Sequence, residues 1–256
     1  MKELSLEGRV AVVIGGTSGI GLALTKGLAA AGADVVPVSR RADAVEEAAS
    51  AVEAAGRRSL RLTADAMDRA SLEGVLRDTL AAFSKVDILV NCAGITKRRP
   101  SLEVPDEEWD SIIATNLTGT FRACQVFGKA MLEAGYGRII NIASLASFIG
   151  LYEATAYTAS KAGVAGLTRA LAVEWGPRGV NVNAIAPGVF RTALNTHLLD
   201  ETGRGQEFLT RTPLKRFGQV GELAPACVFL ASEGASFVNG EVLTVDGGFL
   251  ASGVNQ

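Results

Sequence analysis

A tyrosine and a lysine four positions apart are the side chains of this sequence best suited to moving a proton. Tyr157 and Lys161 bracket the run Tyr-Thr-Ala-Ser-Lys, and Ser144 lies thirteen positions before the tyrosine. On a helix, positions i and i+4 share a face, so the phenol and the ammonium can act on one small volume. A phenol titrates near ~10 in water, and a fixed ammonium beside it lowers that pKa. Such a tyrosine could exchange a proton with an alcohol or carbonyl oxygen at neutral pH.

This pattern also arises by chance on amphipathic helices, so a second motif matters. Between an apolar strand over 10–14 and a helical pattern over 19–31 lies the run Gly15, Gly16, Thr17, Ser18, Gly19, Ile20 and Gly21. Glycines let the backbone approach a pyrophosphate, and the first amides of a helix point at it. The spacing Gly-x-x-x-Gly-x-Gly differs from the commonest dinucleotide fingerprint. The absence of Gly-Lys-Ser/Thr disfavours a triphosphate P-loop, so we expect a dinucleotide.

Strand and helix patterns alternate along the chain. Strand-like runs cover 10–14, 34–39, 59–63, 86–91, 138–142, 180–185 and 241–245, and helical patterns cover 19–31, 42–55, 70–82, 106–134, 155–175 and 220–232. The alternation predicts an α/β fold with a parallel sheet covered by helices on both faces. With no linker visible, we expect one domain over 1–256. The polar stretch over 190–213 is predicted to be a mobile substrate lid, or else an ordinary surface excursion.

Several ordered motifs make the chain resemble the short-chain dehydrogenase/reductase family over essentially its whole length. The glycine run matches the family's Thr-Gly-x-x-x-Gly-x-Gly, although Ile14 replaces the threonine and should cost a local hydrogen bond. Asn91-Cys92-Ala93-Gly94 matches Asn-Asn-Ala-Gly with a cysteine variant, and Pro187-Gly188 with Thr192 matches the segment bordering the nicotinamide. The resemblance implies a Rossmann-type doubly wound sheet of seven strands in the order 3-2-1-4-5-6-7.

The resemblance also implies a reaction, in which hydride moves reversibly between a nicotinamide ring and a carbinol carbon. Tyr157 would be the general acid/base, Ser144 would orient the substrate oxygen, and Lys161 would lower the tyrosine pKa and hold the ribose hydroxyls. Asn116 would hold a water of a proton relay; alternatively, it is a helix asparagine bonded to backbone. No metal is expected. The other implied cofactor contacts are Gly15, Thr17, Ser18, Gly19, Ile20, Gly21, Asp65, Ala66, Asn91, Ala93, Gly94, Pro187, Gly188, Val189 and Thr192.

The end of the second predicted strand bears on the choice of dinucleotide. An acidic residue there would bind the adenine ribose hydroxyls and favour NAD. Ser39 occupies that place and is followed by Arg40 and Arg41. An arginine can pair with a 2′-phosphate through its planar fork, so NADP is favoured over NAD; a solvated charge is the alternative for Arg41. Asp65 would accept from the adenine amino group, or would instead cap a helix.

Three consecutive cations follow the fourth predicted strand, at the sheet edge where ligands bind. Lys97, Arg98 and Arg99 could receive a carboxylate or form a solvated basic turn. This stretch, with Arg211-Thr212-Pro213, Arg216-Phe217-Gly218 and residues 245–250, looks like the gluconate 5-dehydrogenase and 2-deoxy-gluconate 3-dehydrogenase branch of the family. We therefore expect a sugar acid or polyol such as gluconate as substrate. Asn195 and His197 could hydrogen-bond its hydroxyls.

Two other functions remain open. A 3-oxoacyl-thioester (acyl-carrier-protein) reductase shares every catalytic motif and would need a basic patch, to which Arg122, Lys129 and Arg169 could belong. A non-catalytic dinucleotide-sensing protein could keep the fold, but such proteins often lose the tyrosine or the lysine. Both residues are present here.

The composition of the chain argues against several other classes of function. The net charge of −2 over 256 residues gives no electrostatic case for nucleic acid, and no apolar run approaches a membrane span or signal-peptide core. Three cysteines without paired spacing indicate thiols in a reducing cytoplasm. A single histidine, His197, argues against a histidine triad or a multi-histidine metal site. By resemblance, helices 106–134 and 155–175 and the last strand would form the interfaces of a homotetramer.

Overall fold

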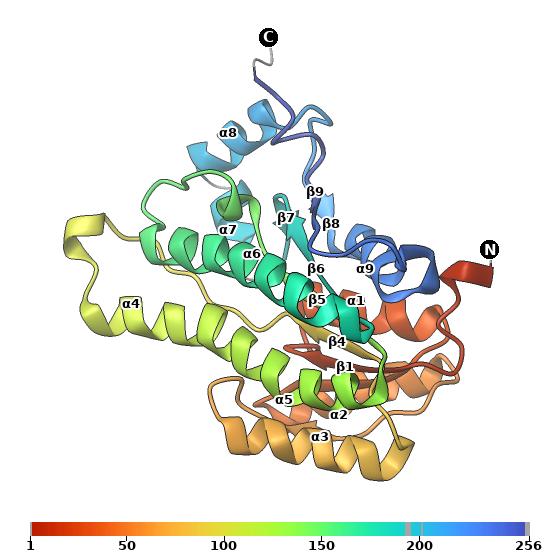
Figure 1. Cartoon of the computed structure of the whole chain (residues 1–256). Helices are drawn as coiled ribbons and strands as arrows, with labels where there is room; N and C mark the ends of the chain where they lie inside the picture. Colours follow the sequence, from red (N-terminus) through yellow and green to blue (C-terminus); the bar gives the residue numbers. More distant parts are fainter. Residues whose placement is uncertain (1, 193–195, 201, 254–256) are drawn as a thin grey trace.

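A parallel sheet forms the centre of the computed structural model, which describes residues 2–192, 196–200 and 202–253 (Figure 1). In spatial order, its strands are β3 (Leu62–Thr63), β2 (Asp34–Ser39), β1 (Val10–Ile14), β4 (Ile88–Asn91), β5 (Gly137–Ile142), β6 (Val180–Pro187) and β9 (Val242–Val245). The predicted order is confirmed. The last strand is numbered β9 because β7 (Phe190–Arg191) and β8 (Gly218–Gln219) pair with each other outside this sheet.

Helices cover both faces of the sheet (Figure 1). In β1, Val12 and Ile14 contribute to one apolar cluster, whereas Ala11 and Val13 contribute to the other, because successive strand residues point to opposite faces. The first cluster is completed by α3 (Arg69–Phe83), α5 (Gly119–Ala134) and α6 (Thr155–Trp175). The second is completed by α1 (Gly19–Ala30), α2 (Ala42–Ala54) and α9 (Ala224–Ala231).

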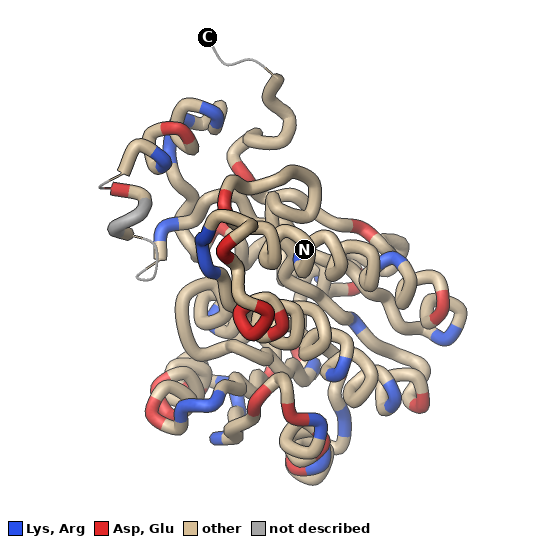
Figure 2. The backbone as a smooth tube through the Cα atoms, turned by 90° about the vertical axis from the view of Figure 1, so that its left-hand side faces the viewer, with Lys and Arg blue, Asp and Glu red and all other residues tan. Residues whose placement is uncertain are grey.

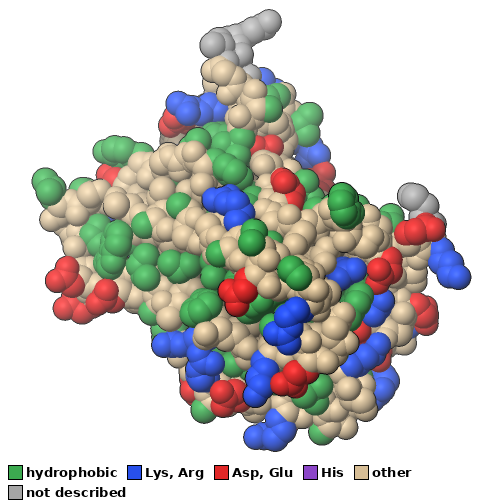
Figure 3. All heavy atoms as spheres, viewed as in Figure 1, with side chains coloured by type: hydrophobic (Ala, Val, Ile, Leu, Met, Phe, Trp, Pro, Cys, Tyr) green, Lys and Arg blue, Asp and Glu red, His purple; other side chains and the backbone are tan. Residues whose placement is uncertain are grey.

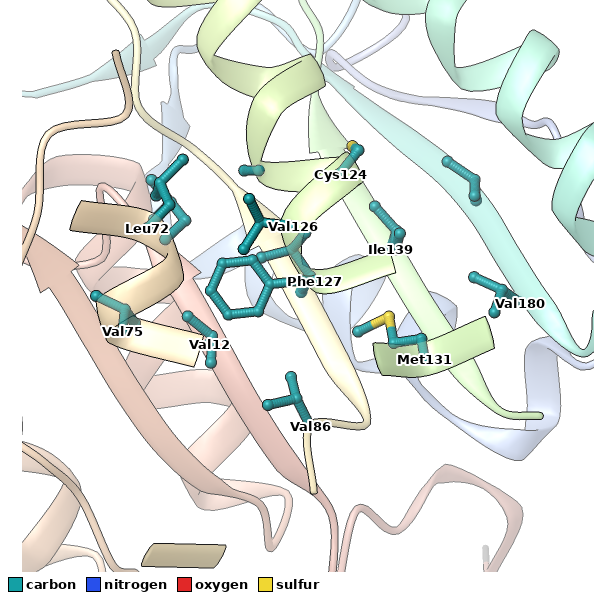
Figure 4. Close-up of a cluster of buried hydrophobic side chains, with 14 of the residues drawn as sticks. Val12, Leu72, Val75, Val86, Cys124, Val126, Phe127, Met131, Ile139 and Val180 are labelled. Atoms are coloured by element: carbon teal, nitrogen blue, oxygen red, sulfur yellow. The ribbon is translucent and has the colours of Figure 1, made fainter. Parts of the chain in front are cut away.

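Phe127 of α5 lies in the middle of the first cluster. Its ring is fully buried, and Figure 4 shows it beside Leu72 and Val75 of α3, Val12 of β1 and Val86, which precedes β4. Burying a side chain of this size stabilises the fold by about 1.5–3 kcal/mol. These contacts fix α5 against the sheet and so position the turn that precedes it.

The helix predicted over 106–134 is helical throughout but is not one regular α-helix. It consists of α4 (Asp106–Ile113), a π-helical turn (Ala114–Thr118) and α5. Asn116 lies in the π turn, and its amide bonds outside the helix to Ile95 and Ser160. π turns of this kind are frequent at functional sites, and the sequence pattern did not show this one.

Two other predicted boundaries were wrong. The strand predicted over 59–63 is limited to β3, because Ser59 donates its hydroxyl to the carbonyl of Val35 instead of joining a regular ladder. The helix predicted over 220–232 divides into a 3₁₀ turn (Val220–Leu223) and α9. Pro225 stands at the start of α9, where a residue without a backbone N–H is tolerated.

The stretch predicted to be a lid contains β7, α7 (Thr196–Asp200) and α8 (Gly203–Arg211). Figure 1 shows α8 above the loop that leads into α6, and the guanidinium of Arg204 bonds that loop at the carbonyl of Tyr152. Among the described residues, no helix combines the length and apolar character needed to cross a bilayer.

Candidate active site

The strand ends bring the predicted motifs together at one edge of the sheet. Ile14 of β1 is in register with Asn91 of β4, which is in register with Asn141 of β5. Pro187 of β6 is likewise in register with Val245 of β9. Because all these strands are parallel, the segments that follow them share the carboxyl edge, where open α/β sheets bind ligands.

The glycine turn passes unusually close to the backbone that follows β4. Gly15 has φ +80°, and a methyl group on it would stand 2.6 Å from the amide nitrogen of Ala93. Ser18 is the N-cap of α1 but makes no side-chain capping bond. The first amides of α1 therefore lack a capping partner from Ser18, as an anion site at a helix N-terminus requires.

The segment that follows β6 also borders the glycine turn. The amide of Gly188 donates to Val245, which fixes the exit of β6 against β9. A methyl group on Gly19 would lie 3.8 Å from the side-chain methyl of Thr192. Thr192, on the segment that follows Pro187 and Gly188, therefore lies beside Gly19 of the glycine turn.

The charged residues expected to bind the adenosine end of the cofactor lie at the protein surface. Arg40, whose side chain is 72% exposed, lies 3.9 Å from Oδ2 of Asp65. The other oxygen of Asp65 accepts from the amide of Met67, while Asp68 is the residue that caps α3. Helix capping by Asp65 was therefore wrong. Arg41 pairs with Asp43, which fits the alternative that it is a solvated charge.

The side chain of Asn91 is buried and bonds to a neighbouring strand. It is 4% exposed and donates its amide to Oδ1 of Asn141 at 2.9 Å, and Asn141 donates in turn to Thr168. Together with Ala66 and Ala93, Asn91 lines a small hollow beside Ile14. The side chain of Asn91 ties β4 to β5, so its expected contribution to the cofactor site is indirect.

Lys161 and Tyr157 lie one turn apart on α6. The Nζ atom of Lys161 is 5.8 Å from the centroid of the Tyr157 ring and donates to the carbonyl of Ile142 at 2.7 Å. Lys161 is 5% exposed, and this burial lowers its pKa to about 8. Ser144 caps the 3₁₀ turn after β5 and reaches the phenol of Tyr157 through a side-chain hydrogen bond.

The expected lowering of the tyrosine pKa by Lys161 was wrong for this structure. Burial raises the pKa of Tyr157, and this effect outweighs the hydrogen bond from Ser144, which acts in the opposite direction. The ammonium of Lys161 is directed at the Ile142 carbonyl. The phenol is therefore held as a proton donor, which is the form that reduction of a carbonyl needs.

Asn116 connects the loop after β4 with α6. Its Oδ1 accepts from the amide of Ile95 at 2.8 Å, and its Nδ2 donates to Ile95 O at 2.9 Å and to Oγ of Ser160 at 3.0 Å. A methyl group on Gly94 would stand 3.3 Å from Asn116 Oδ1 and 3.6 Å from Lys161 Nζ. The backbone-bonding alternative is confirmed, and Asn116 lies next to the lysine.

The three predicted substrate cations do not share one environment. Lys97 and Arg99 both pair with the buried carboxylate of Glu108 in α4, at 3.4 and 3.2 Å. Arg98 instead pairs with Glu153 at 2.9 Å, just before α6. Among the three, Arg98 is therefore the one whose side chain pairs with the segment that leads to Tyr157. Asn195 lies outside the described residues, as does the side chain of His197.

Three residues near the site were not predicted to belong to it. Cys92 interacts electrostatically with both Lys161 and Tyr157, and burial raises its pKa to about 11. Glu153 has φ +58° and bonds Arg98, and Arg204 of α8 bonds the preceding residue. The sequence gives no sign of the left-handed backbone at Glu153, because such a conformation is usually adopted by glycine or asparagine.

Known proteins with the same sequence features support this arrangement. A protein family described as enoyl-(acyl carrier protein) reductase matches residues 15–250. The chain belongs to the short-chain dehydrogenase/reductase family. Members of this family use NAD(P) and act on CH–OH groups, so the protein is a dehydrogenase of this class.

Individual members of the short-chain dehydrogenase/reductase family match nearly the whole chain. Identity is 42% to the D-threitol dehydrogenase of Mycolicibacterium smegmatis, over 96% of this chain and 95% of that one. It is also 42% to the 2-dehydro-3-deoxy-D-gluconate 5-dehydrogenase of Escherichia coli, over 98% and 99%. The crystal structure of a gluconate 5-dehydrogenase from Burkholderia cenocepacia in complex with NADP and tartrate is 35% identical, with a TM-score of 0.94 over 98% of both chains.

Proposed function

We propose that this dehydrogenase oxidises and reduces a small sugar acid or polyol, such as gluconate, with NADP. The observation that carries the proposal is the contact of Ser144 with Tyr157 one turn from the buried Lys161, beside the glycine turn. The uncapped start of α1 and the close approach at Gly15 fit a dinucleotide pyrophosphate. When bound, the nicotinamide supplies or accepts the hydride.

The residues of the chain supply the proton and the orientation. Tyr157 donates its phenolic proton to the forming alkoxide in reduction and recovers it in oxidation. Ser144 hydrogen-bonds the same oxygen and fixes it next to the phenol. Lys161 would hold the ribose hydroxyls of the cofactor, as the resemblance to the family implies. Asn116 holds the loop at Gly94 against α6 and so keeps the lysine in place.

The substrate class follows from the relatives and from one local feature. The relatives are named for threitol and for gluconate derivatives, and one related structure holds tartrate. All of these compounds are short, hydroxylated chains. In this protein, four cations (Lys97, Arg98, Arg99 and Arg204) stand near four carboxylates (Glu103, Glu108, Glu153 and Glu207) beside the start of α6. The carboxylate of an acidic substrate is a suitable partner for the arginines of this cluster.

The cofactor choice depends on Arg40. Its exposed guanidinium, 3.9 Å from Asp65, can turn to a 2′-phosphate. We expect Arg40→Ala to lower kcat/KM with NADP about tenfold or more, because charged hydrogen bonds are worth about 1.5–3 kcal/mol, and to leave kcat/KM with NAD nearly unchanged. Arg41→Ala is the matched control. Equal losses with both dinucleotides would contradict the assignment.

The test of the function is nicotinamide absorbance during oxidation of gluconate and of glucitol, beside reduction of a 3-oxoacyl thioester. Turnover of a sugar acid or polyol that Tyr157→Phe lowers about 10²- to 10⁴-fold would support the proposal. Turnover of the thioester alone would move the protein to the acyl-carrier-protein reductases. Cofactor binding without turnover of any of them would favour a dinucleotide sensor.

The thioester alternative keeps some support from the description of the matching family. Its expected basic patch is weaker than predicted, because Arg122 donates to the carbonyl of Met67. Lys129 and Arg169 are exposed on α5 and α6. Figure 2 shows basic and acidic residues interspersed along the backbone on the side that faces the viewer.

We also propose a homotetramer in the cytoplasm. Hydrophobic side chains gather over α4, α5 and α6 in Figure 3, and exposed apolar residues there include Trp109, Phe121 and Val173. Surfaces of this kind mark association sites. The free thiols of Cys92, Cys124 and Cys227 fit a reducing compartment.

A further inference from the structure

Two arginines from separate elements meet at the turn that precedes α6. Arg204 of α8 donates from Nη1 to the carbonyl oxygen of Tyr152 at 3.1 Å. The next residue, Glu153, accepts from Nη2 of Arg98 at 2.9 Å. Glu153 adopts φ +58°, a left-handed conformation that is uncommon for a residue with a long side chain. The turn is therefore held in a special shape by contacts from both sides.

The loop that carries Arg98 is tied to the same turn. The amide of Arg99 donates to the carbonyl of Glu153 at 2.9 Å, and the hydroxyls of Ser101 and Thr155 lie 2.5 Å apart. Thr155 begins α6, and Tyr157 follows within its first turn. The turn at Tyr152 and Glu153 thus leads directly into the part of α6 that carries Tyr157.

The two guanidinium groups lie near two carboxylates, Glu153 and Glu207. Burial lowers the pKa of half-buried Arg204, and the charge of Arg98 lowers it further, while Glu207 and Glu153 act in the opposite direction. Arg98 and Arg204 bond the neighbouring residues Glu153 and Tyr152, respectively. Glu153, 23% exposed, is the carboxylate that Arg98 binds between them. A second carboxylate at this place would be favoured by both arginines.

We propose that Arg204 and Arg98 together bind the carboxylate of the sugar-acid substrate, with Arg204 delivered by the helix α8 that covers the site. This inference rests on the proposed function and names the part of the site that recognises the acid end of the substrate. Glu153 positions Arg98, and the carbonyl of Tyr152 positions Arg204. Neither arginine touches the reacting carbon, so both determine specificity rather than chemistry.

The experiment compares acids with polyols of equal chain length, gluconate with glucitol and threonate with threitol, in the NADP assay. We expect Arg204→Gln to raise KM for the acid about tenfold or more while kcat and KM for the polyol change less than about twofold. Arg204→Lys should recover part of the loss, since it keeps the charge but not the fork. Arg211→Gln, on the same helix, is the control. Thermal unfolding of each variant checks that it folds.

The possible failures are distinguishable. Equal changes for acid and polyol would show that Arg204 only holds α8 in place, and would overturn the inference while the proposed function stands. A wild type that oxidises the polyols and neither acid would overturn it as well, and would limit the function to polyols. A wild type that turns over none of the four compounds would overturn both the inference and the proposed function.

Discussion

Lys161 is buried, and burial disfavours its charged form. The side chain is 5% exposed, its Nζ donates to a single backbone carbonyl at 2.7 Å, and its pKa falls to about 8. A lysine in the unfolded chain titrates near ~10.4. The folded protein therefore binds this proton less tightly than the unfolded chain does, which is a stability cost kept at the site where the chemistry needs a cation.

That cost predicts a pH dependence. Because the folded pKa is depressed, the penalty is complete below about pH 8 and disappears as the pH rises towards ~10.4. Relative to Lys161→Met, the free energy of unfolding of the wild type should rise by about 1 kcal/mol between pH 7 and pH 9. Denaturant titrations without cofactor at both pH values measure this difference. Equal changes in the two proteins would contradict the buried, depressed lysine. The variant should also lose turnover.

At the scale of elements, the site depends on how closely α1 approaches its neighbours. Gly27 of α1 faces Ala224, the first residue of α9, and a methyl group on Gly27 would stand 2.4 Å from the Cβ of Ala224. Neither backbone can yield without moving a helix. Since α1 begins at the glycine turn, its position against α9 also sets the direction of the amides that face the expected pyrophosphate.

Gly27→Ala should therefore lower the free energy of unfolding by about 1–3 kcal/mol, the usual cost of overpacking. The matched control is Gly74→Ala in α3, where the nearest atom, Nη2 of Arg77, would be 3.7 Å from the new methyl group. Removing a mid-helix glycine there should raise the free energy of unfolding by about 0.5–1 kcal/mol. Urea denaturation of the three proteins measures both effects. Equal shifts in both variants would argue against a tight α1–α9 contact.

Two helical segments show which features a sequence pattern can predict and which it cannot. Helix α6 has the bounds that the sequence predicted, because its apolar periodicity is regular over the whole length. The π turn at Asn116 was not predicted, since the bonds of this asparagine to Ile95 and Ser160 join segments far apart in the sequence. The apolar periodicity of residues 106–134 does not indicate that Asn116 bonds to these partners.

At the scale of the whole molecule, apolar side chains remain exposed over α4, α5 and α6. Val173 of α6 is 80% exposed. If this face joins copies of the chain, light scattering should give four times the mass of one chain, and Val173→Glu should reduce that mass by placing a charge in a dry contact. Ala54→Glu, on α2 over the other face of the sheet, should leave the mass unchanged. A wild type with the mass of one chain would exclude the assembly.

The strand order came from the resemblance to the family, whereas the sequence by itself determined the order of the elements and indicated a candidate proton-transfer pair. These depend on local information: alternating apolar residues, glycines where the backbone must approach closely, and an i, i+4 spacing on one helix face. It also indicated the carboxyl edge of the sheet as the place where the motifs meet.

Only the tertiary structure decided which charges neighbour one another and what burial does to them. Lys97 and Arg99 turned out to share Glu108, Arg98 to bind Glu153, and Arg204 to arrive from another helix. The raised pKa of Tyr157, opposite to expectation, has the same origin. Desolvation and charge pairing depend on distances across the fold, and residues far apart in the chain set those distances.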